Sequence, residues 1–441
     1  MKNLTKRLLV ISLALLSIQT QANEIKSVID KDYQQHLASL WDHFHRNPEL
    51  SLMEFKTAKR LAAEIRAAGF EVTENVGGTG IVAIMKNGEG PTVMMRADMD
   101  GLPVIEQSGL ANASKAVMKD WNGEEVGVMH ACGHDVHITS LVGTARYMAS
   151  SKDKWSGTLM LIGQPAEERG PGASAMMDDN LWQRFPKPDY AFAFHVNAAA
   201  EAGKVTVDEG SPYAGADTVD IIVHGVGSHG AYPHQGKDPI MIASQIVNNL
   251  QTIVSRELAP RDAGVVTVGA FHSGTKHNII SDKAHLQLTV RSLNPRVREQ
   301  LLAAIERIAI GTAKTAGMSD DKLPEVTVSE FSFPPTQNDK TLAQRVKQTL
   351  VNKMGQEALT PPNNSGMGAE DFGFFTTKPY IPSVYFSVGG TPKEDFERAK
   401  KGGAAVASHH SPLFKISPEP AVKSGIEATV HILLDLMKKQ P

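Results

Sequence analysis

The sequence predicts an α/β protein: a mixed-sheet main domain with helices on both faces, plus an inserted α+β domain. Short β-rich runs alternate with helical runs in the first half of the chain. A different order of strands and helices begins near residue 213, and the first pattern resumes after residue 333. At 441 residues the chain also exceeds what one hydrophobic core usually supports, so more than one domain is expected.

The first residues are typical of a secretory signal. Lys2, Lys6 and Arg7 form a basic start, and an apolar run follows over 8–18. Thr20-Gln21-Ala22 then resembles a signal-peptidase site. The run is shorter than the roughly 20 residues that a membrane-spanning helix needs. We therefore expect residues 1–22 to be removed and the protein to be exported, periplasmic or secreted, without membrane attachment; an uncleaved helix at the membrane surface is the alternative.

The main domain is expected over residues 23–212 and again over 334–441. Apolar residues recur at helical spacing over 28–44 and 54–68, and Gly69 suits a left-handed helix end. The other expected elements are strands at 81–85, 92–97, 158–162, 190–195, 204–207 and 383–387, and helices at 134–149, at 342–354 and after Ser417-Pro418-Glu419. This alternation favours a largely parallel sheet that is covered on both faces.

The inserted domain is expected over residues 213–333. Its elements follow the order strand, helix, strand, strand, helix, strand, which is that of a ferredoxin-like domain. Their ranges are 218–223, 239–258, 264–271, 285–291, 295–316 and 324–329. Asp238 before Pro239 is a typical helix start.

Charge and cysteine content narrow the classes of function. The formal net charge is −3, and the sequence pI is near 6.6. A nucleic-acid-binding domain would show a basic face or a high pI, so no nucleic-acid partner is expected. The single Cys excludes a disulfide within the chain. A lone thiol in an oxidising compartment is at risk unless it binds a metal ion or is buried.

Four short motifs supply thiol, imidazole and carboxylate groups, which are the ligands of borderline metal ions. They are Met-His-Ala-Cys-Gly-His-Asp-Val-His (129–137), Gln-Pro-Ala-Glu-Glu (164–168), Phe-His-Val (194–196) and His-His-Ser-Pro (409–412). Several of them follow predicted strands, where open α/β sheets place their ligands. Metal-assisted hydrolysis is therefore the leading interpretation.

Cys132 and His134 stand at the turn into a predicted helix and can face one cleft. Asp135 and His137 are close enough to orient the imidazole of His134. The alternative for Cys132 is a small buried apolar residue.

Glu167 and Glu168 follow the end of a predicted strand, where adjacent side chains point in different directions. One carboxylate can bind a metal ion while the other takes a proton from water; a solvated acidic pair is the alternative. His195 ends an apolar strand and is either a ligand or a hydrogen-bonded core residue. Spacing leaves open whether His409 or His410 would be the ligand.

Six motifs in order resemble the metal-dependent amidohydrolase family, which includes hippurate hydrolases, N-acyl-amino-acid amidohydrolases and indole-acetyl-amino-acid hydrolases. They are Arg-Ala-Asp-Met-Asp-Gly-Leu-Pro (96–103), His-Ala-Cys-Gly-His-Asp-Val-His (130–137), Gln-Pro-Ala-Glu-Glu (164–168), His-Val (195–196), Gly-Ser-His-Gly-Ala-Tyr-Pro-His (227–234) and Gly-Ala-Glu-Asp-Phe (368–372). The resemblance extends from about residue 33 to the C-terminus.

The resemblance implies a binuclear site for two divalent ions, zinc, manganese or similar. The ligands it implies are Cys132, His134, Glu168, His195 and His410. Glu167 would be the general base, and Asp98 would orient a ligand histidine.

The resemblance also implies that the inserted domain is a lid through which the protein forms a homodimer. His229 would reach the partner's active site and stabilise the oxyanion. Asn278 and Arg291 would hold the substrate's carboxylate, although a plain surface role is the alternative for Arg291. Residues 111–126 form a longer link than in the shortest family members and could shape the substrate entrance.

The expected function is hydrolysis of the amide bond of small N-acyl-amino acids or similar conjugates. The alternatives are a dipeptidase or carboxypeptidase of the same fold, a catalytically silent binding protein, and a cysteine hydrolase with Cys132 as nucleophile.

Overall fold

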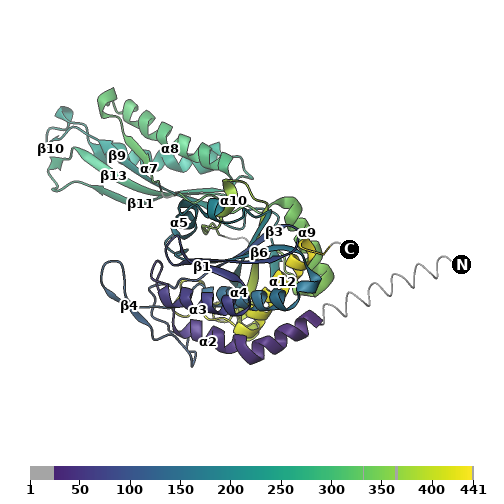
Figure 1. Ribbon diagram of the computed structural model, residues 1–441. Coiled ribbons are helices and arrows are strands. Elements are labelled where there is room, and N and C mark those ends of the chain that lie inside the picture. The colour runs from purple at the N-terminus through teal and green to yellow at the C-terminus, as the bar shows by residue number, and fades with distance from the viewer. Residues whose placement is uncertain (1–23, 331, 363–365, 440–441) are drawn as a thin grey trace. The chain divides into compact units, whose positions relative to one another are not determined.

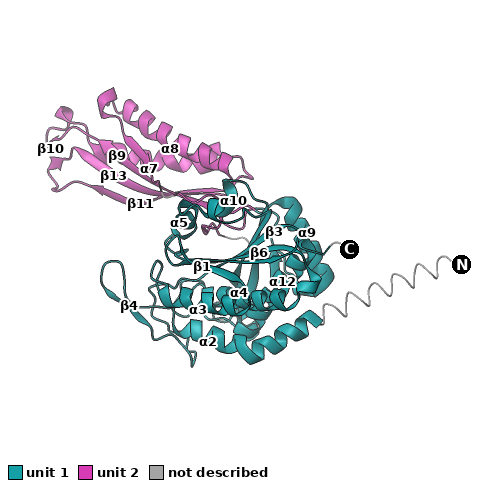
Figure 2. Cartoon of the chain, in the orientation of Figure 1, with its two compact units in different colours: residues 1–210, 338–363, 374–441 teal, residues 211–337, 364–373 magenta. Residues whose placement is uncertain are grey.

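The computed structural model describes residues 24–330, 332–362 and 366–439, so the predicted signal peptide over 1–22 lies outside the described residues. The chain divides into two compact units (Figure 2). The first comprises residues 1–210, 338–363 and 374–441, and the second comprises residues 211–337 and 364–373. Each unit has a hydrophobic core of its own.

The segment 364–373 was expected in the main domain, but it belongs to the second unit. Its backbone explains this assignment. Ala369 forms a β-bridge with Ala214, and the N–H of Ala214 donates to the carbonyl of Gly368 at 2.8 Å. Such pairing between distant segments leaves no local pattern in the sequence.

A seven-stranded sheet forms the centre of the first unit (Figure 1). Its strands, in spatial order, are β1 (Glu71–Val76), β2 (Gly80–Asn87), β6 (Gly157–Gln164), β3 (Thr92–Asp98), β7 (Tyr190–Glu201), β15 (Ser383–Thr391) and β8 (Val205–Val207). The pairs β6–β3, β3–β7 and β7–β15 are parallel, and the outer pairs are antiparallel. The predicted mixed α/β class is confirmed, but only the centre of the sheet is parallel.

The central strands are buried along almost their whole length. In β3, every residue from Val93 to Asp98 is buried. A strand that is buried on both faces needs helices on both sides of the sheet, which explains its near-continuous apolar sequence.

Helices of the first unit pack around this sheet. They are α2 (Ala38–Arg46), α3 (Phe55–Ala67), α4 (His134–Ser150), α5 (Gly172–Asp178), α6 (Leu181–Arg184), α9 (Lys340–Met354), α10 (Gly373–Thr377), α11 (Lys393–Lys400) and α12 (Pro418–Leu436). The buried helix α4 packs against α12 and against β3 and β7. A Cβ atom on Gly143 of α4 would lie 2.3 Å from Ile426 Cδ1, so a larger residue at 143 would force the Ile426 side chain of α12 to move.

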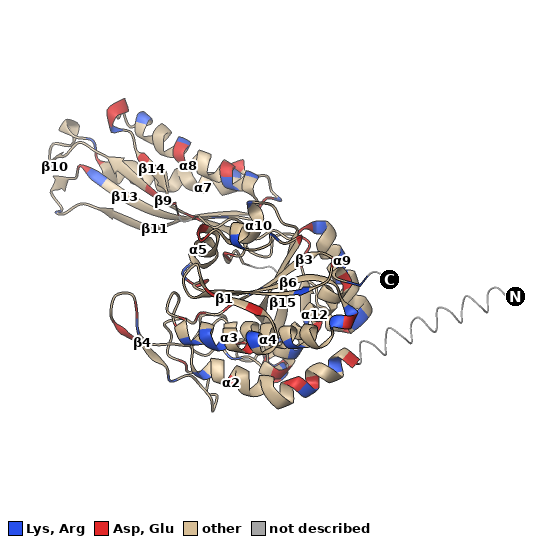
Figure 3. Cartoon of the chain, viewed as in Figure 1, with Lys and Arg blue, Asp and Glu red and all other residues tan. Residues whose placement is uncertain are grey.

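The second unit is an antiparallel four-stranded sheet with two helices on one face. In chain order its elements are β9 (Gly215–His224), α7 (Pro239–Thr252), β11 (Gly264–Ser273), β13 (Lys283–Ser292), α8 (Pro295–Thr315) and β14 (Glu325–Val328), and the sheet order is β11-β13-β9-β14. The Asp238 side chain accepts from the N–H of Ile240 and so caps α7. Basic and acidic residues are interspersed along α8 (Figure 3).

Two short ribbons complete the molecule. β4 (Val117–Lys119) and β5 (Glu125–Gly127) form a hairpin in the first unit. This hairpin lies in the long link predicted at 111–126 and extends one residue beyond it. β10 (Ser228–His229) pairs with β12 (Ile279–Ile280) in the second unit. Among the described residues, no helix has both the length and the hydrophobicity needed to cross a membrane.

Candidate metal centre

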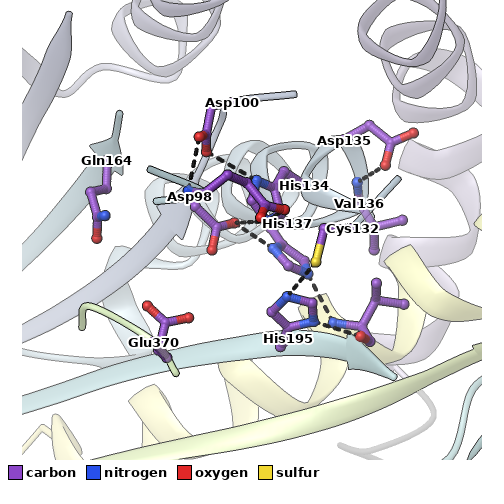
Figure 4. A network of polar contacts seen from close by, with 12 residues as sticks. Asp98, Asp100, Cys132, His134, Asp135, Val136, His137, Gln164, His195 and Glu370 are labelled. Atoms are coloured by element: carbon purple, nitrogen blue, oxygen red, sulfur yellow. Dashed lines mark hydrogen bonds and ion pairs between the residues drawn. The ribbon is translucent and has the colours of Figure 1, made fainter. Parts of the chain in front are cut away.

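The carboxyl ends of three neighbouring parallel strands bring the predicted site segments together in the first unit. β3 ends at Asp98, β6 ends just before the Glu167–Glu168 pair, and His195 lies within β7. Side chains at the carboxyl ends of parallel neighbours meet at one edge of a sheet. Figure 4 shows several of these side chains pointing toward one another beside the start of α4.

Cys132 and His134 are placed by a tight turn into α4. Gly133 between them has φ +83°, a left-handed conformation that suits glycine. A Cβ atom on Gly133 would also lie 2.2 Å from Val196 Cγ1. Both Cys132 and His134 are buried. A residue other than glycine at 133 would therefore displace two side chains of the site.

Among the groups of side chains that could hold a metal ion, three overlapping sets consist only of predicted ligands and the predicted base, and the ligand atoms within each set lie within 4.8 Å of one another. Cys132 belongs to two of the sets. The sets are Cys132, His134 and His195; Cys132, Glu168 and His410; and His134, Glu167 and Glu168. The structure thus brings together all the predicted ligands and the predicted base.

His195 and His137 are oriented by hydrogen bonds to the backbone. Nδ1 of His195 lies 2.6 Å from the carbonyl of Val196 and must carry the proton, so Nε2 faces Cys132 Sγ at 3.4 Å. In His137, Nε2 accepts the N–H of Val196 at 2.8 Å, and Nδ1 donates to Asp98 at 2.5 Å. Both nitrogens of His137 are thus engaged, one with Asp98 at the end of β3 and the other with Val196 within β7.

The geometry separates His409 from His410, which spacing could not. Nε2 of His409 accepts the N–H of Ala198 at 3.1 Å, so the proton lies on Nδ1, 3.7 Å from Cys132 Sγ. Nε2 of His410 lies 3.2 Å from Glu168 Oε2. Of the two, only His410 belongs to a metal-capable set among the described residues.

Asp100, which was not predicted as a site residue, connects two of the predicted ligands. Its Oδ1 lies 3.2 Å from His134 Nδ1, and its Oδ2 accepts the N–H of Glu168 at 3.0 Å. Asp98 and Asp100 lie two positions apart in an extended segment, so their side chains share one side. That spacing in the Arg-Ala-Asp-Met-Asp motif is the signal that could have identified Asp100.

A fully buried guanidinium stabilises the negative charge of Asp98. Arg96 Nη1 lies 2.5 Å from Asp98 Oδ2, and Arg96 Nε donates to Gln164 at 2.7 Å. Burial alone would raise the pKa of Asp98. The positive charge of Arg96 and the interactions with His134 and His137 instead lower this pKa well below its usual value. Asp98 is therefore a carboxylate at neutral pH.

The carboxylates around Cys132 and His134 favour binding of cations. Burial alone would lower the pKa of His134, but the carboxylates of Asp98, Asp100 and Glu168 raise it to about 10. Burial, together with the carboxylates of Glu168 and Glu167, raises the pKa of the Cys132 thiol well above its usual value. A divalent ion would replace these protons and stabilise the same negative charge.

Two buried atoms without hydrogen bonds support this interpretation. His134 Nε2 and Glu168 Oε1 have no hydrogen-bond partner among the described residues, and they lie 3.9 Å apart. Buried polar atoms are normally paired. Thiol, imidazole and carboxylate are also the donors that zinc and related divalent ions bind. The residues present therefore fit divalent metal ions.

The other three predicted site residues belong to the second unit. His229 is exposed in β10, and Asn278 is its neighbour, since the N–H of Gly230 donates to the carbonyl of Asn278 at 2.8 Å. The half-buried Arg291 lies in β13, where burial lowers its pKa. Asn278 Oδ1 is buried and has no hydrogen-bond partner among the described residues.

The sequence pattern of the peptidase family M20/M25/M40 matches residues 94–431. The chain belongs to this family. The thermostable carboxypeptidase 2 of Saccharolobus solfataricus is 36% identical over 92% of this chain and 95% of its own length. The hippurate hydrolase of Campylobacter jejuni is 36% identical over 78% of this chain and 86% of its own length.

A crystal structure of the YXEP protein of Bacillus subtilis, described as a dinuclear metal binding peptidase from the M20 family, is similar to this M20 chain. The two are 26% identical, with a TM-score of 0.75 over 92% of this chain and 99% of that one. The predicted family, and the prediction of a metal-dependent hydrolase, are therefore confirmed.

The predicted export is contradicted by these relatives. The thermostable carboxypeptidase 2 and the hippurate hydrolase are cytosolic enzymes, so a periplasmic or secreted localisation is wrong for this M20 protein. A basic start before a short apolar run is weak evidence, because helices that lie on a membrane surface share it. The case for Cys132 as a ligand then depends on its neighbours and not on an oxidising compartment.

Proposed function

We propose that this protein hydrolyses the amide bond of N-acyl-amino acids or similar amino-acid conjugates and releases a carboxylic acid and an amino acid. The convergence of thiol, imidazole and carboxylate groups around Cys132, beside the Glu167 carboxylate, carries this proposal. Membership of the M20/M25/M40 family and similarity to a hippurate hydrolase support it.

Two divalent ions, zinc, manganese or similar, would be held by the two sets that share Cys132. One set is Cys132, His134 and His195, and the other is Cys132, Glu168 and His410. When bound, such ions polarise a carbonyl group and lower the pKa of a water molecule. The shared Cys132 and the description of the YXEP protein as dinuclear both support two ions.

Glu167 would act as the general base. Its carboxylate lies within 4.8 Å of ligand atoms of His134 and Glu168, and its side chain is only partly buried, so substrate and water can reach it. In this role Glu167 takes a proton from the attacking water and returns it to the leaving amine nitrogen.

The second unit would be a ferredoxin-like lid through which the protein forms a homodimer. Its strand order, β11-β13-β9-β14, supports the fold assignment. Arg291 and Asn278 would hold the carboxylate of the amino-acid half, because a guanidinium and an amide NH₂ group both donate hydrogen bonds to carboxylate oxygens. His229 would stabilise the oxyanion in the partner's active site.

Two alternatives from the sequence differ in their support. A carboxypeptidase or dipeptidase of the same fold is favoured by the similarity to the thermostable carboxypeptidase 2. A cysteine hydrolase is disfavoured, because burial and the carboxylates of Glu168 and Glu167 raise the pKa of Cys132 and keep the thiol protonated.

A substrate screen tests the proposal. Enzyme reconstituted with zinc or manganese is assayed on N-acyl-amino acids of varied acyl group and on dipeptides with a free amine, and chelated enzyme is the control. We expect the metal-loaded enzyme to turn over the acylated substrates, and we expect the chelator to abolish this turnover. Turnover of dipeptides alone would favour the peptidase, whereas activity that survives the chelator but not a thiol alkylator would favour the cysteine hydrolase.

A further inference from the structure

The loop of residues 49–54, between α2 and α3, is hydrogen-bonded to two segments of the candidate site. The carbonyl of Glu49 accepts the N–H of Gly101 at 2.7 Å, and Ser51 Oγ donates to Asp100 Oδ2 at 2.6 Å. Glu54 Oε1 accepts the N–H of Ala166 at 2.8 Å. This loop therefore connects the end of β3 with the turn that carries Glu167.

Glu54 makes the contact to that turn with a fully buried carboxylate. Besides Ala166, Oε1 accepts the N–H of Leu52 at 2.9 Å, and Oε2 accepts the hydroxyl of Thr79 at 2.6 Å. Thr79 directly precedes β2. The carboxylate thus joins three segments that are distant in sequence, and both of its oxygens are used.

Ala166 needs such an anchor because of its backbone conformation. Its φ is +50°, in the left-handed region that residues with a Cβ atom seldom adopt. Such a conformation persists only where the surroundings enforce it. Ala166 immediately precedes Glu167, so relaxation of its backbone would redirect both Glu167 and Glu168.

We propose that Glu54 is a positioning residue: its carboxylate holds Ala166 in the left-handed conformation that directs Glu167 and Glu168 into the candidate metal centre. The length of the Glu54 side chain would be essential for this role, and its negative charge would matter little. Only the activity part of the test below rests on the proposed function, since metal affinity is measured independently of any substrate.

Substitutions at Glu54 separate reach from charge. Glu54→Gln keeps the length of the side chain and one acceptor oxygen, and its amide can donate to the Thr79 hydroxyl. Glu54→Asp keeps the charge but is one methylene shorter, so it cannot span from Thr79 to Ala166. If the length of the side chain matters, Glu54→Gln should keep activity and Mn²⁺ affinity, and Glu54→Asp should lose them. If the negative charge matters, the reverse is expected.

Glu49 offers a matched control in the same loop. Its Oε2 accepts three hydrogen bonds, from the N–H groups of Lys56 and Thr57, both at 2.8 Å, and from the Thr57 hydroxyl at 3.0 Å. These bonds hold the start of α3. Glu49→Asp should therefore perturb the loop and the stability of the fold without affecting Ala166.

The experiment uses the full chain and compares kcat, KM and the dissociation constant for Mn²⁺ from titration calorimetry. For Glu54→Asp we expect kcat to fall about 100-fold at little changed KM, as for a misplaced catalytic group. Its Mn²⁺ affinity should fall about 10-fold or more. Glu54→Gln and Glu49→Asp should stay within about 3-fold of wild type in both measurements.

The proposal is overturned if Glu54→Asp retains wild-type kcat and Mn²⁺ affinity, or if Glu54→Gln loses as much as Glu54→Asp. If Glu54→Asp does not fold, Thr79→Val replaces it; this variant removes one of the three bonds and should shift both quantities in the same direction, and unchanged values overturn the proposal. Wild-type enzyme without amidase activity would refute the proposed function alone, because the Mn²⁺ affinities would still test Glu54.

Discussion

Asp100 accepts a hydrogen bond from the backbone N–H of Glu168, at 3.0 Å from its Oδ2. This contact ties the end of β3 to the turn after β6 in the first unit. The other oxygen of Asp100 faces His134 at 3.2 Å, so one carboxylate positions groups from two motifs that lie far apart in the sequence.

We therefore predict that Asp100→Asn weakens metal binding, because the amide retains one acceptor but loses the charge that favours the bound cation. Loss of such an outer partner typically costs about 10- to 100-fold in metal affinity. Titration calorimetry with Zn²⁺ or Mn²⁺ measures the effect. Asp135→Asn is the control. Asp135 is equally buried, but its carboxylate binds His45 at 2.8 Å, so the metal affinity of this variant should be nearly that of the wild type. Equal losses in both variants would argue against a specific role for Asp100.

Glu167→Ala is expected to abolish turnover while metal content stays near that of the wild type. A positioned general base typically contributes about 10²- to 10⁴-fold to the rate. Single-turnover kinetics together with elemental analysis of the purified protein check both parts. Glu168→Ala should instead lose metal. A large loss of bound metal from Glu167→Ala would mean that Glu167 is a ligand and not the base.

His229→Ala should lower kcat about 10²- to 10³-fold without changing metal content, as removal of an oxyanion donor does. If His229 acts in the partner's site, mixing this variant with Glu167→Ala creates mixed dimers in which one of the two sites is complete. Free exchange of subunits should then restore about a quarter of the wild-type activity. No recovery in a mixture shown to contain mixed dimers would exclude a role across the dimer.

The Trp121 ring contacts Arg169, the residue that follows Glu168 in the sequence: the Arg169 guanidinium carbon lies 4.0 Å from the ring centre. We expect Trp121→Ala to raise KM for N-acyl-amino acids by roughly 2- to 5-fold, the value of one exposed cation–π contact that orders the entrance. Val117→Ala, an exposed position on the same hairpin, is the control. Unchanged KM in the Trp121 variant would show that the hairpin does not shape substrate binding.

The ion pairs of His45 should make the folded protein less stable as the pH rises into the alkaline range. Burial alone would lower its pKa, but Asp135 at 2.8 Å and Glu106 at 3.4 Å raise it to about 10. The folded-state pKa thus exceeds the value of about 6.5 expected in the unfolded chain. The stabilisation is therefore fully present below about pH 6.5 and is lost as the pH rises toward 10.

Denaturant unfolding of wild type and His45→Gln checks this dependence. The difference in the free energy of unfolding should be largest near neutral or lower pH and should shrink as the pH approaches 10. A difference that stays constant over that range would mean that the two carboxylates do not bind a charged His45.

Much of the fold was predictable because the spacing of apolar residues along the chain indicates its helices and central strands. The strands β3 and β6 and the helix that begins at His134 follow from the alternation of apolar β-rich runs with helical runs. The edges of the sheet were harder, since β1 has no buried residue except Val76 and therefore lacks a clear apolar pattern. The predicted export is contradicted by the relatives; it rested on a basic start and a short apolar run, which helices that lie on a membrane surface share.

The sequence by itself determined the ligand chemistry: its motifs contain the thiol, imidazoles and carboxylates that later meet at one end of the sheet. The tertiary structure alone decided which neighbours face the site. His409 and His410 are adjacent, yet the φ of +64° at His410 directs only that imidazole toward Glu168. Likewise Asp100 and Glu54 hold Glu168 and Ala166 through hydrogen bonds between segments that only folding brings within reach, and no local pattern encodes such distances.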